Sequence, residues 1–159
     1  MDGVLTDFNK RFGELFGGRP EQTEDRKVHF HNNWDAFVQG GNFGTLDMHP
    51  DATKLLEAVK TLNVPVEILS SSGGKKYHEC VTLQKEAWLR NHGIEYKANI
   101  VPGGWLKADW AKPWHILIDD SEHVVEPYID AGGTAILHYD IDVTIKKLYE
   151  LHLEWVGGQ

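Results

Sequence analysis

Four groups of polar residues in this sequence have the types and the spacing to act together on an anionic molecule. They are Asp2 and Asp7 in the opening segment MDGVLTDF, Ser70 to Lys76 after one apolar stretch, Lys107 before another, and Asp119 with Asp120 at its end. In an open α/β sheet, ligands bind beyond the carboxyl ends of the strands. If both apolar stretches are parallel strands of one sheet, the four groups converge on one edge of it.

Asp119 and Asp120 are candidate metal ligands. Two adjacent carboxylates at the end of an apolar strand repel each other unless a cation or water shares them. Hard oxygen ligands of this kind suit Mg²⁺, which keeps several waters and binds one or two carboxylates plus a phosphate. The alternative is that one aspartate caps the next helix while the other is solvated.

Ser70, Ser71, Ser72 and Gly73 form a candidate phosphate-binding turn. Hydroxyls and accessible backbone N–H groups can hold a phosphate oxygen, although the same composition also fits an ordinary turn from a strand to a helix. Lys107 offers a point positive charge to a phosphate or to the carboxylates. A lone lysine in a loop is otherwise simply exposed to solvent.

The segments that must position these groups alternate between strand and helix from residue 47 onward. Short apolar runs predict strands within 64–69, 98–101, 115–119 and 134–139, and helical spacing predicts helices within 47–62, 81–92, 121–133 and 141–156. The third helix is expected to be interrupted or to end around Pro127. Strands separated by helices are parallel with right-handed crossovers, so we predict a three-layer, Rossmann-like α/β sheet.

Residues 9–46 differ in composition and are predicted to form a small cap insertion within a single domain that spans residues 1–159. They are rich in Gly, Asn, His and aromatic residues, with helices expected within 8–17 and 34–39. Trp34 packs in the core of this cap or stacks on a base of a ligand. The alternating histidines of the segment HFH lack nearby cysteine or acidic partners and are a weak metal signal.

Composition restricts the class of partner and the compartment. The formal net charge of -8 disfavours binding to polymeric nucleic acid, whereas a small anion can still bind where a metal or backbone N–H groups neutralise it. No apolar run approaches the length of about 20 residues that crosses a bilayer, so we expect no membrane association. Cys80 is the single cysteine and cannot form an internal disulfide, which favours a reducing, cytoplasmic setting.

Four of these pieces, in order, resemble the four motifs of the haloacid dehalogenase-like phosphatases. The family pattern is a strand followed by Asp-x-Asp-Gly, a strand ending in Ser or Thr, a lysine, and a strand ending in paired acids. The segments that match are MDGVLTDF, ILSSS, the loop around Lys107, and ILIDD. More narrowly, LIDD followed by GGTAILH, the segment QKEAWLRNHGI and the small insertion resemble the deoxyribonucleotidase branch, including its phage-borne relatives.

The resemblance implies Mg²⁺-dependent hydrolysis of a small phosphorylated substrate, a (deoxy)nucleoside monophosphate, through an aspartyl-phosphate. Asp2 would act as general acid and then as general base. Ser70 would hold a phosphoryl oxygen, and Lys107 would steady the nucleophile and the phosphate.

The remaining site residues follow from the same resemblance. Asp2, Asp119 and Asp120 would bind Mg²⁺, which offsets the charge of the transition state. The turn formed by Ser71, Ser72 and Gly73 would contact the substrate.

The resemblance also places the nucleophilic aspartate two residues before Asp2, on a central strand of the sheet, and only Met1 stands ahead of Asp2 here. We therefore expect a gap in the sheet flanked by unpaired backbone groups, and weak or absent turnover by the 159-residue chain. Three explanations are open. The sequence is a piece of a longer enzyme; it is an inactive relative that binds a phosphorylated ligand or a protein partner; or another segment, or a second copy in a homodimer, fills the gap.

Overall fold

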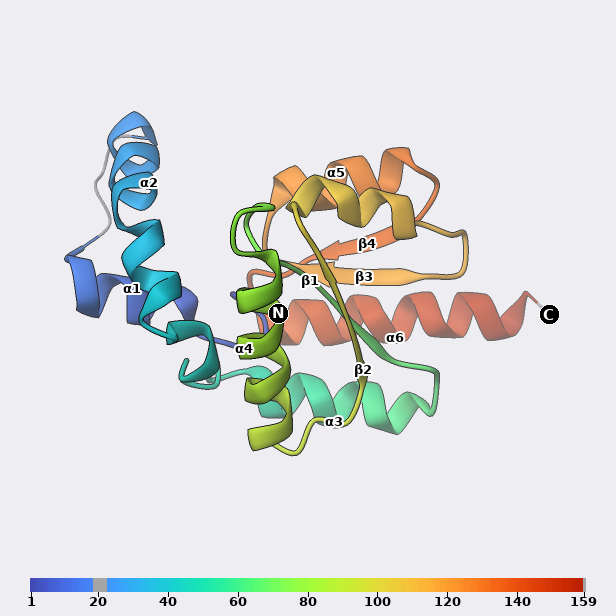
Figure 1. Cartoon of the computed structure of the whole chain (residues 1–159). Helices are drawn as coiled ribbons and strands as arrows, with labels where there is room; N and C mark the ends of the chain where they lie inside the picture. Colours follow the sequence, from blue (N-terminus) through green and yellow to red (C-terminus); the bar gives the residue numbers. More distant parts are fainter. Residues whose placement is uncertain (19–22, 159) are drawn as a thin grey trace.

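The computed structural model describes residues 1–18 and 23–158, without the side chains of residues 23 and 24 (Figure 1). The chain has a mixed α/β fold with short parallel strands, so the predicted α/β class is confirmed. Residues 19–22 of the predicted cap insertion lie outside the described residues. Within the described part of the chain, no helix combines the length and the apolar character needed to cross a bilayer.

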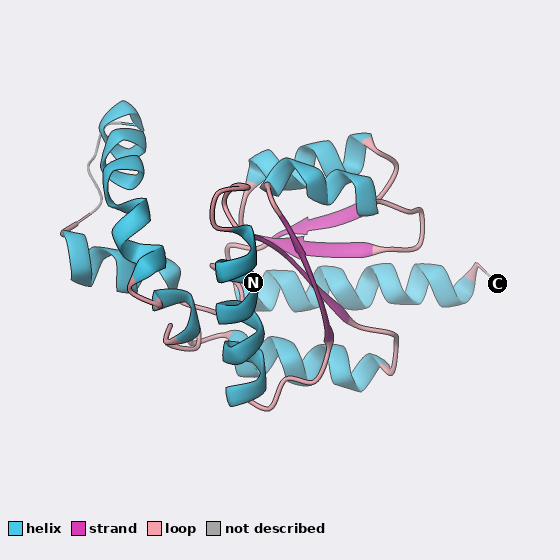
Figure 2. Ribbon diagram, in the orientation of Figure 1, coloured by secondary structure: helices cyan, strands magenta, loops and turns pink. Residues whose placement is uncertain are grey.

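The four strands form two separate parallel pairs. Strand β1 (Glu67–Ser71) pairs with β2 (Lys97–Val101), and β3 (Ile116–Asp119) pairs with β4 (Thr134–Leu137). Strands β1 (EILSS) and β3 (ILID) end in polar residues, Ser70–Ser71 and Asp119, whereas β2 (KANIV) and β4 (TAIL) are apolar to their ends. The polar carboxyl ends of β1 and β3 lead into the loops of the candidate site. Figure 2 shows both pairs between the surrounding helices.

The described residues do not form the single sheet that the strand-helix alternation predicts. Among them, no backbone ladder joins β1 to β3. Side chains make the connection instead: Leu69 packs against the cluster around Leu117, and Ile118 packs against the main core. The facing edges of β1 and β3 therefore lack strand partners within the described part of the chain, as expected of a gap in a sheet.

Four helices surround the strands, close to where the sequence predicts them. They are α3 (Ala52–Leu62), α4 (His78–Asn91), α5 (Glu122–Asp130) and α6 (Ile141–Gly157). Helix α5 continues through Pro127 instead of breaking there and lacks one backbone hydrogen-bond donor at that position. Lys107 lies in a 3₁₀ helix, η2 (Gly104–Trp110), rather than in an irregular loop.

Two helices precede this α/β body and lie together to one side of it (Figure 1). Helix α1 (Phe8–Phe16) is capped by the Asp7 carboxylate, which accepts from the Lys10 N–H at 3.2 Å, and α2 (Thr23–Gln39) is longer than the segment predicted. Their aromatic rings pack against one another: Phe8 and Phe37 meet edge to face with centroids 5.0 Å apart, and Phe12 stacks on Phe30. The short 3₁₀ helix η1 (Asn42–Gly44) adds the Phe43 ring.

The core of these two helices is continuous with that of the body. One cluster of buried apolar side chains runs from Phe12 and Phe37 through Met1 and Val4 to Trp88 on α4. The indole N–H of Trp88 donates to the Leu46 carbonyl at 2.7 Å, so its polar atom is satisfied inside the core. The described residues of 9–46 are thus packed onto the body.

Gly73 provides a test of how α2 packs on the body. Its φ is +76°, and a Cβ atom there would lie 2.5 Å from a ring carbon of Trp34. We expect Gly73→Ala to lower the free energy of unfolding by about 1–3 kcal/mol, measured by urea denaturation.

Gly13→Ala is the matched control. Gly13 lies inside α1, and a Cβ there meets nothing within 4 Å. This substitution should leave the stability unchanged or raise it by about 1 kcal/mol. Equal losses in both variants would contradict the close packing of Trp34 on the turn.

Candidate functional site

Asp2 is held in a tight turn at the start of the chain. The Met1 carbonyl accepts from the N–H groups of Leu5 at 2.7 Å and Thr6 at 3.1 Å. This closes the loop so that the Thr6 hydroxyl donates to Asp2 Oδ1 at 3.0 Å. The second carboxylate oxygen, Oδ2, accepts from the Lys85 ammonium at 2.6 Å. Burial by itself would raise the pKa of Asp2, but Lys85, the Met1 amine and Thr6 together lower it below its usual value.

Lys85 is the central side chain of the site, and the sequence analysis did not select it. Its side chain is 0% exposed, and its Nζ donates to Asp2, to Ser70 Oγ at 2.9 Å and to the Ser71 carbonyl at 2.8 Å. All three ammonium protons therefore have acceptors, as a buried lysine requires. The signal was present in the sequence, because Lys85 stands on the buried stripe of α4 between Val81 and Trp88.

Lys107 and Asp119 form a second buried ion pair. Lys107 Nζ lies 2.6 Å from Asp119 Oδ2, and the two side chains are 7% and 5% exposed. The other carboxylate oxygen of Asp119 accepts from the Ser121 N–H at 3.1 Å, at the start of α5. Asp119 is therefore neutralised by a lysine and also helps to hold the turn into the helix.

Asp120 differs from Asp119 because it is exposed and has no ion pair among the described residues. Its carboxylate rests against the backbone of Gly3, where a Cβ would come within 2.0 Å of Oδ2. Desolvation and then repulsion by Asp119 and Asp2 raise its pKa. Asp119 and Asp2 repel this carboxylate, the Met1 amine attracts it, and solvent screens part of both effects. A carboxylate with two acidic neighbours is suited to a divalent ion.

The two ion pairs meet around the N-terminal amine. The amine of Met1 is buried, and its pKa is lowered to about 6 by burial first and then by Lys107, with Lys85 adding to the effect. Asp2 and Asp119 act on the same amine in the opposite direction. The opening turn, the end of β1 and the end of β3 thus converge on one location, as the sequence predicts for Asp2, Ser70, Lys107 and Asp119. Asp7, predicted with them, caps α1 instead.

The remaining predicted residues belong to the turn that follows β1. Ser72 is fully buried, and its hydroxyl lies 2.9 Å from His78 Nδ1 and 3.1 Å from the Gly74 carbonyl. Ser71 Oγ accepts from the Gly73 N–H at 3.0 Å. The turn therefore satisfies much of its own polarity, and Ser70 is the only one of its three serines that contacts Lys85 through its hydroxyl.

A hollow of about 460 Å³ lies between α2 and this turn. Trp34 and Asp35 contribute to it from α2, and residues 73–77 close the other side. Lys76 bridges the two walls through an ion pair of 2.5 Å with Asp35. Residues 73–77 of this wall directly follow Ser70 to Ser72 in the chain, although the three serines do not line the hollow.

No protein-family model matches this chain, and no curated protein or solved structure matches it significantly.

A double-mutant cycle on Asp2 and Lys85 tests the buried pair. Lys85→Met leaves the Asp2 carboxylate without its cation, and Asp2→Asn leaves a buried ammonium without its anion. We expect each to lower the free energy of unfolding by about 3 kcal/mol in urea, and the double variant to lose clearly less than the sum.

The exposed pair Lys10–Asp47 is the control for this cycle. Its N···O distance is the same, 2.6 Å, but both side chains are 52% exposed. Its coupling energy should stay below about 1 kcal/mol, because water screens the two charges. Equal coupling in the two pairs would show that Lys85 is not buried as described.

Proposed function

We propose that this chain carries a Mg²⁺-dependent site for phosphate monoesters of the haloacid dehalogenase type, with nucleoside monophosphates as its ligands. One observation carries the proposal: two ion pairs from the segments of the site lie around the Met1 amine. In one pair the Lys85 ammonium binds both Asp2 and Ser70, and in the other Lys107 binds Asp119. Residues of these types at the carboxyl ends of parallel strands suit an anionic ligand.

The charge balance of the site supports a role for a divalent cation. Asp2, Asp119 and Asp120 provide three carboxylates, against which Lys85 and Lys107 provide two ammonium groups. This excess of negative charge disfavours a phosphate, and a bound Mg²⁺ would reverse it. Asp120 fits the ion because its carboxylate is repelled by its neighbours and faces the Gly3 backbone. When bound there, Mg²⁺ would neutralise charge on the phosphoryl oxygens.

The chain's own residues would then have the following chemical roles. Ser70 offers a hydroxyl to a phosphoryl oxygen, and the two lysines attract the phosphate. Asp2, whose pKa is lowered by Lys85 despite burial and whose other oxygen accepts from Thr6, is positioned as a carboxylate to accept a proton from water. The resemblance also assigns it the donation of a proton to the leaving alcohol, a role that the lowered pKa opposes. The hollow beside Trp34 would receive the nucleoside, whose base has a ring on which to stack.

A second candidate function is binding without turnover. The acids at the site, within the described residues, are Asp2, Asp119 and Asp120, and Lys85 and Lys107 engage the first two. The resemblance assigns nucleophilic attack to a further aspartate two residues before Asp2. The 159-residue chain is therefore proposed to bind a nucleotide or a phosphorylated partner and to hydrolyse it weakly or not at all.

The same resemblance implies one three-layer sheet with a central strand between β1 and β3. In the described part of the chain, the edges of β1 and β3 that lack strand partners support it. An upstream segment, or a strand from a second copy in a homodimer, would complete the ladder.

Ligand-induced stabilisation tests the proposed site. We expect thermal denaturation of the chain to shift upward with nucleoside monophosphates only when Mg²⁺ is present, because binding to the native state alone stabilises it by about 2.7 kcal/mol at 100-fold excess over Kd. Asp120→Asn and Lys107→Met should abolish the shift.

Asp130→Asn, an exposed acid at the end of α5, is the control and should retain the full shift. A shift of equal size without Mg²⁺, or one that survives Asp120→Asn, would contradict the metal-dependent site. If no nucleoside monophosphate shifts the denaturation temperature, the second candidate function has no phosphorylated ligand among these compounds.

Phosphate release tests turnover. The 159-residue chain should release little phosphate from these compounds. A version extended upstream by an apolar strand ending in aspartate, two residues before Asp2, should turn them over and should unfold at higher urea concentration. Robust turnover by the shorter chain that Asp2→Asn abolishes would disprove the proposed weak activity, and an extension that changes neither property would disprove the central strand.

A further inference from the structure

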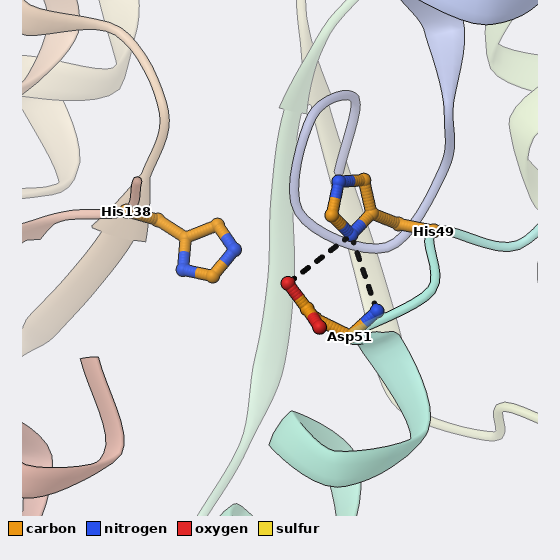
Figure 3. Close-up of side chains that lie close together, drawn as sticks. All are labelled: His49, Asp51 and His138. Carbon is orange, nitrogen blue, oxygen red and sulfur yellow. Dashed lines mark hydrogen bonds and ion pairs between the residues drawn. The ribbon is translucent and has the colours of Figure 1, made fainter. Parts of the chain in front are cut away.

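Three side chains that take no part in the Lys85 and Lys107 ion pairs lie close together (Figure 3). They are His49, Asp51 and His138. One potential ligand atom from each lies within 4.8 Å of the others. They come from distant parts of the chain: His49 precedes α3, Asp51 stands at the start of α3, and His138 follows β4. None of them was selected from the sequence.

His138 is held rigidly by its surroundings. The residue is 5% exposed, and its backbone N–H donates to the Asp119 carbonyl at 2.7 Å. Its Nδ1 lies 2.8 Å from Thr144 Oγ1, a buried hydroxyl on α6. In Figure 3 the other ring nitrogen faces Asp51 and His49. A histidine that binds a metal through one nitrogen commonly has the other fixed by a hydrogen bond in this way.

His49 and Asp51 are also anchored near this nitrogen. The His49 N–H donates to the Leu5 carbonyl at 2.9 Å, which ties the residue to the opening turn. Its Nδ1 lies 4.0 Å from Asp51 Oδ2 and accepts a long bond of 3.3 Å from the Asp51 N–H. The Asp51 carboxylate makes no capping bond to α3 within the described residues and is free to turn toward the histidines.

The electrostatic surroundings favour a cation. Asp51, Asp120 and Asp140 all act on His138 as nearby negative charges, and His49 is the basic group that opposes them.

We propose that His49, Asp51 and His138 bind one divalent transition-metal ion of the zinc class. Two imidazole nitrogens and one carboxylate oxygen are ligands that such ions prefer over Mg²⁺. Zinc bonds of about 2.1 Å in a tetrahedron place ligand atoms roughly 3.4 Å apart, so small side-chain rotations bring the three into range. Three protein ligands leave a position for water or for an oxygen of a bound molecule.

This site is distinct from the acids proposed for Mg²⁺ and does not rest on the phosphatase proposal. It joins the opening turn, the start of α3 and the end of β4 through one ion. A bound metal would therefore fix the carboxyl edge of β3–β4 against the first turn.

Metal titration of the full chain tests the proposal. After chelator treatment, the chain should bind Zn²⁺ in a one-to-one ratio by calorimetry, and Co²⁺ should give visible absorption bands of nitrogen and oxygen coordination. A large excess of Mg²⁺ should displace neither ion. Failure to bind Zn²⁺ and Co²⁺, or displacement by Mg²⁺, would overturn the proposal.

Variants locate the ion. His49→Gln, Asp51→Asn and His138→Gln should each remove the Co²⁺ bands, and Thr144→Val, which keeps the shape but loses the hydroxyl, should weaken Zn²⁺ binding about 10-fold. His123→Gln, an exposed histidine on α5, should leave binding unchanged. Asp51→Asn disturbs no core packing, so it reports on the ion even if His138→Gln unfolds the chain. Unchanged Co²⁺ bands in His49→Gln and Asp51→Asn would refute the assignment.

Discussion

The buried ammonium of Lys85 is the interaction on which the candidate site depends. The α4 stripe that carries it also carries Val81 and Trp88, so helix packing places the lysine inside the protein. A buried charge without partners costs several kcal/mol, and three acceptors from the opening turn and from the end of β1 offset that cost. The packing of α4 therefore determines where Asp2 and Ser70 must lie.

Two different sets of possible cation ligands lie near the carboxyl ends of the strands, at separate positions. Carboxylates and hydroxyls lie at the opening turn and at the ends of β1 and β3, where two lysines leave one acid without a partner among the described residues. Imidazoles and Asp51 lie beyond the end of β4. Hard ions prefer the first set and borderline transition metals prefer the second, so the two proposed sites need not compete for one ion.

The apolar core holds the side chains of both candidate sites in place although the strands form two separate pairs. Backbone ladders join β1 to β2 and β3 to β4, while side chains such as Leu69 and Ile118 cross between the pairs. The aromatic cluster of α1 and α2 belongs to the same core. This continuity brings Trp34 against the turn after β1, and a hollow lies between that turn and α2.

The sequence by itself determined the alternation of strands and helices and the edge at which the acids, serines and Lys107 gather, because these follow from local periodicity and from the direction of parallel strands. Only the tertiary structure decided which charges neutralise each other. Lys85 and Asp2 are 83 positions apart, and local spacing carries no information about such a pair. For the same reason the sequence did not indicate the cluster of His49, Asp51 and His138. The local histidine pattern is HFH, whereas His49 and His138 become neighbours only when β4 and the start of α3 pack around the opening turn.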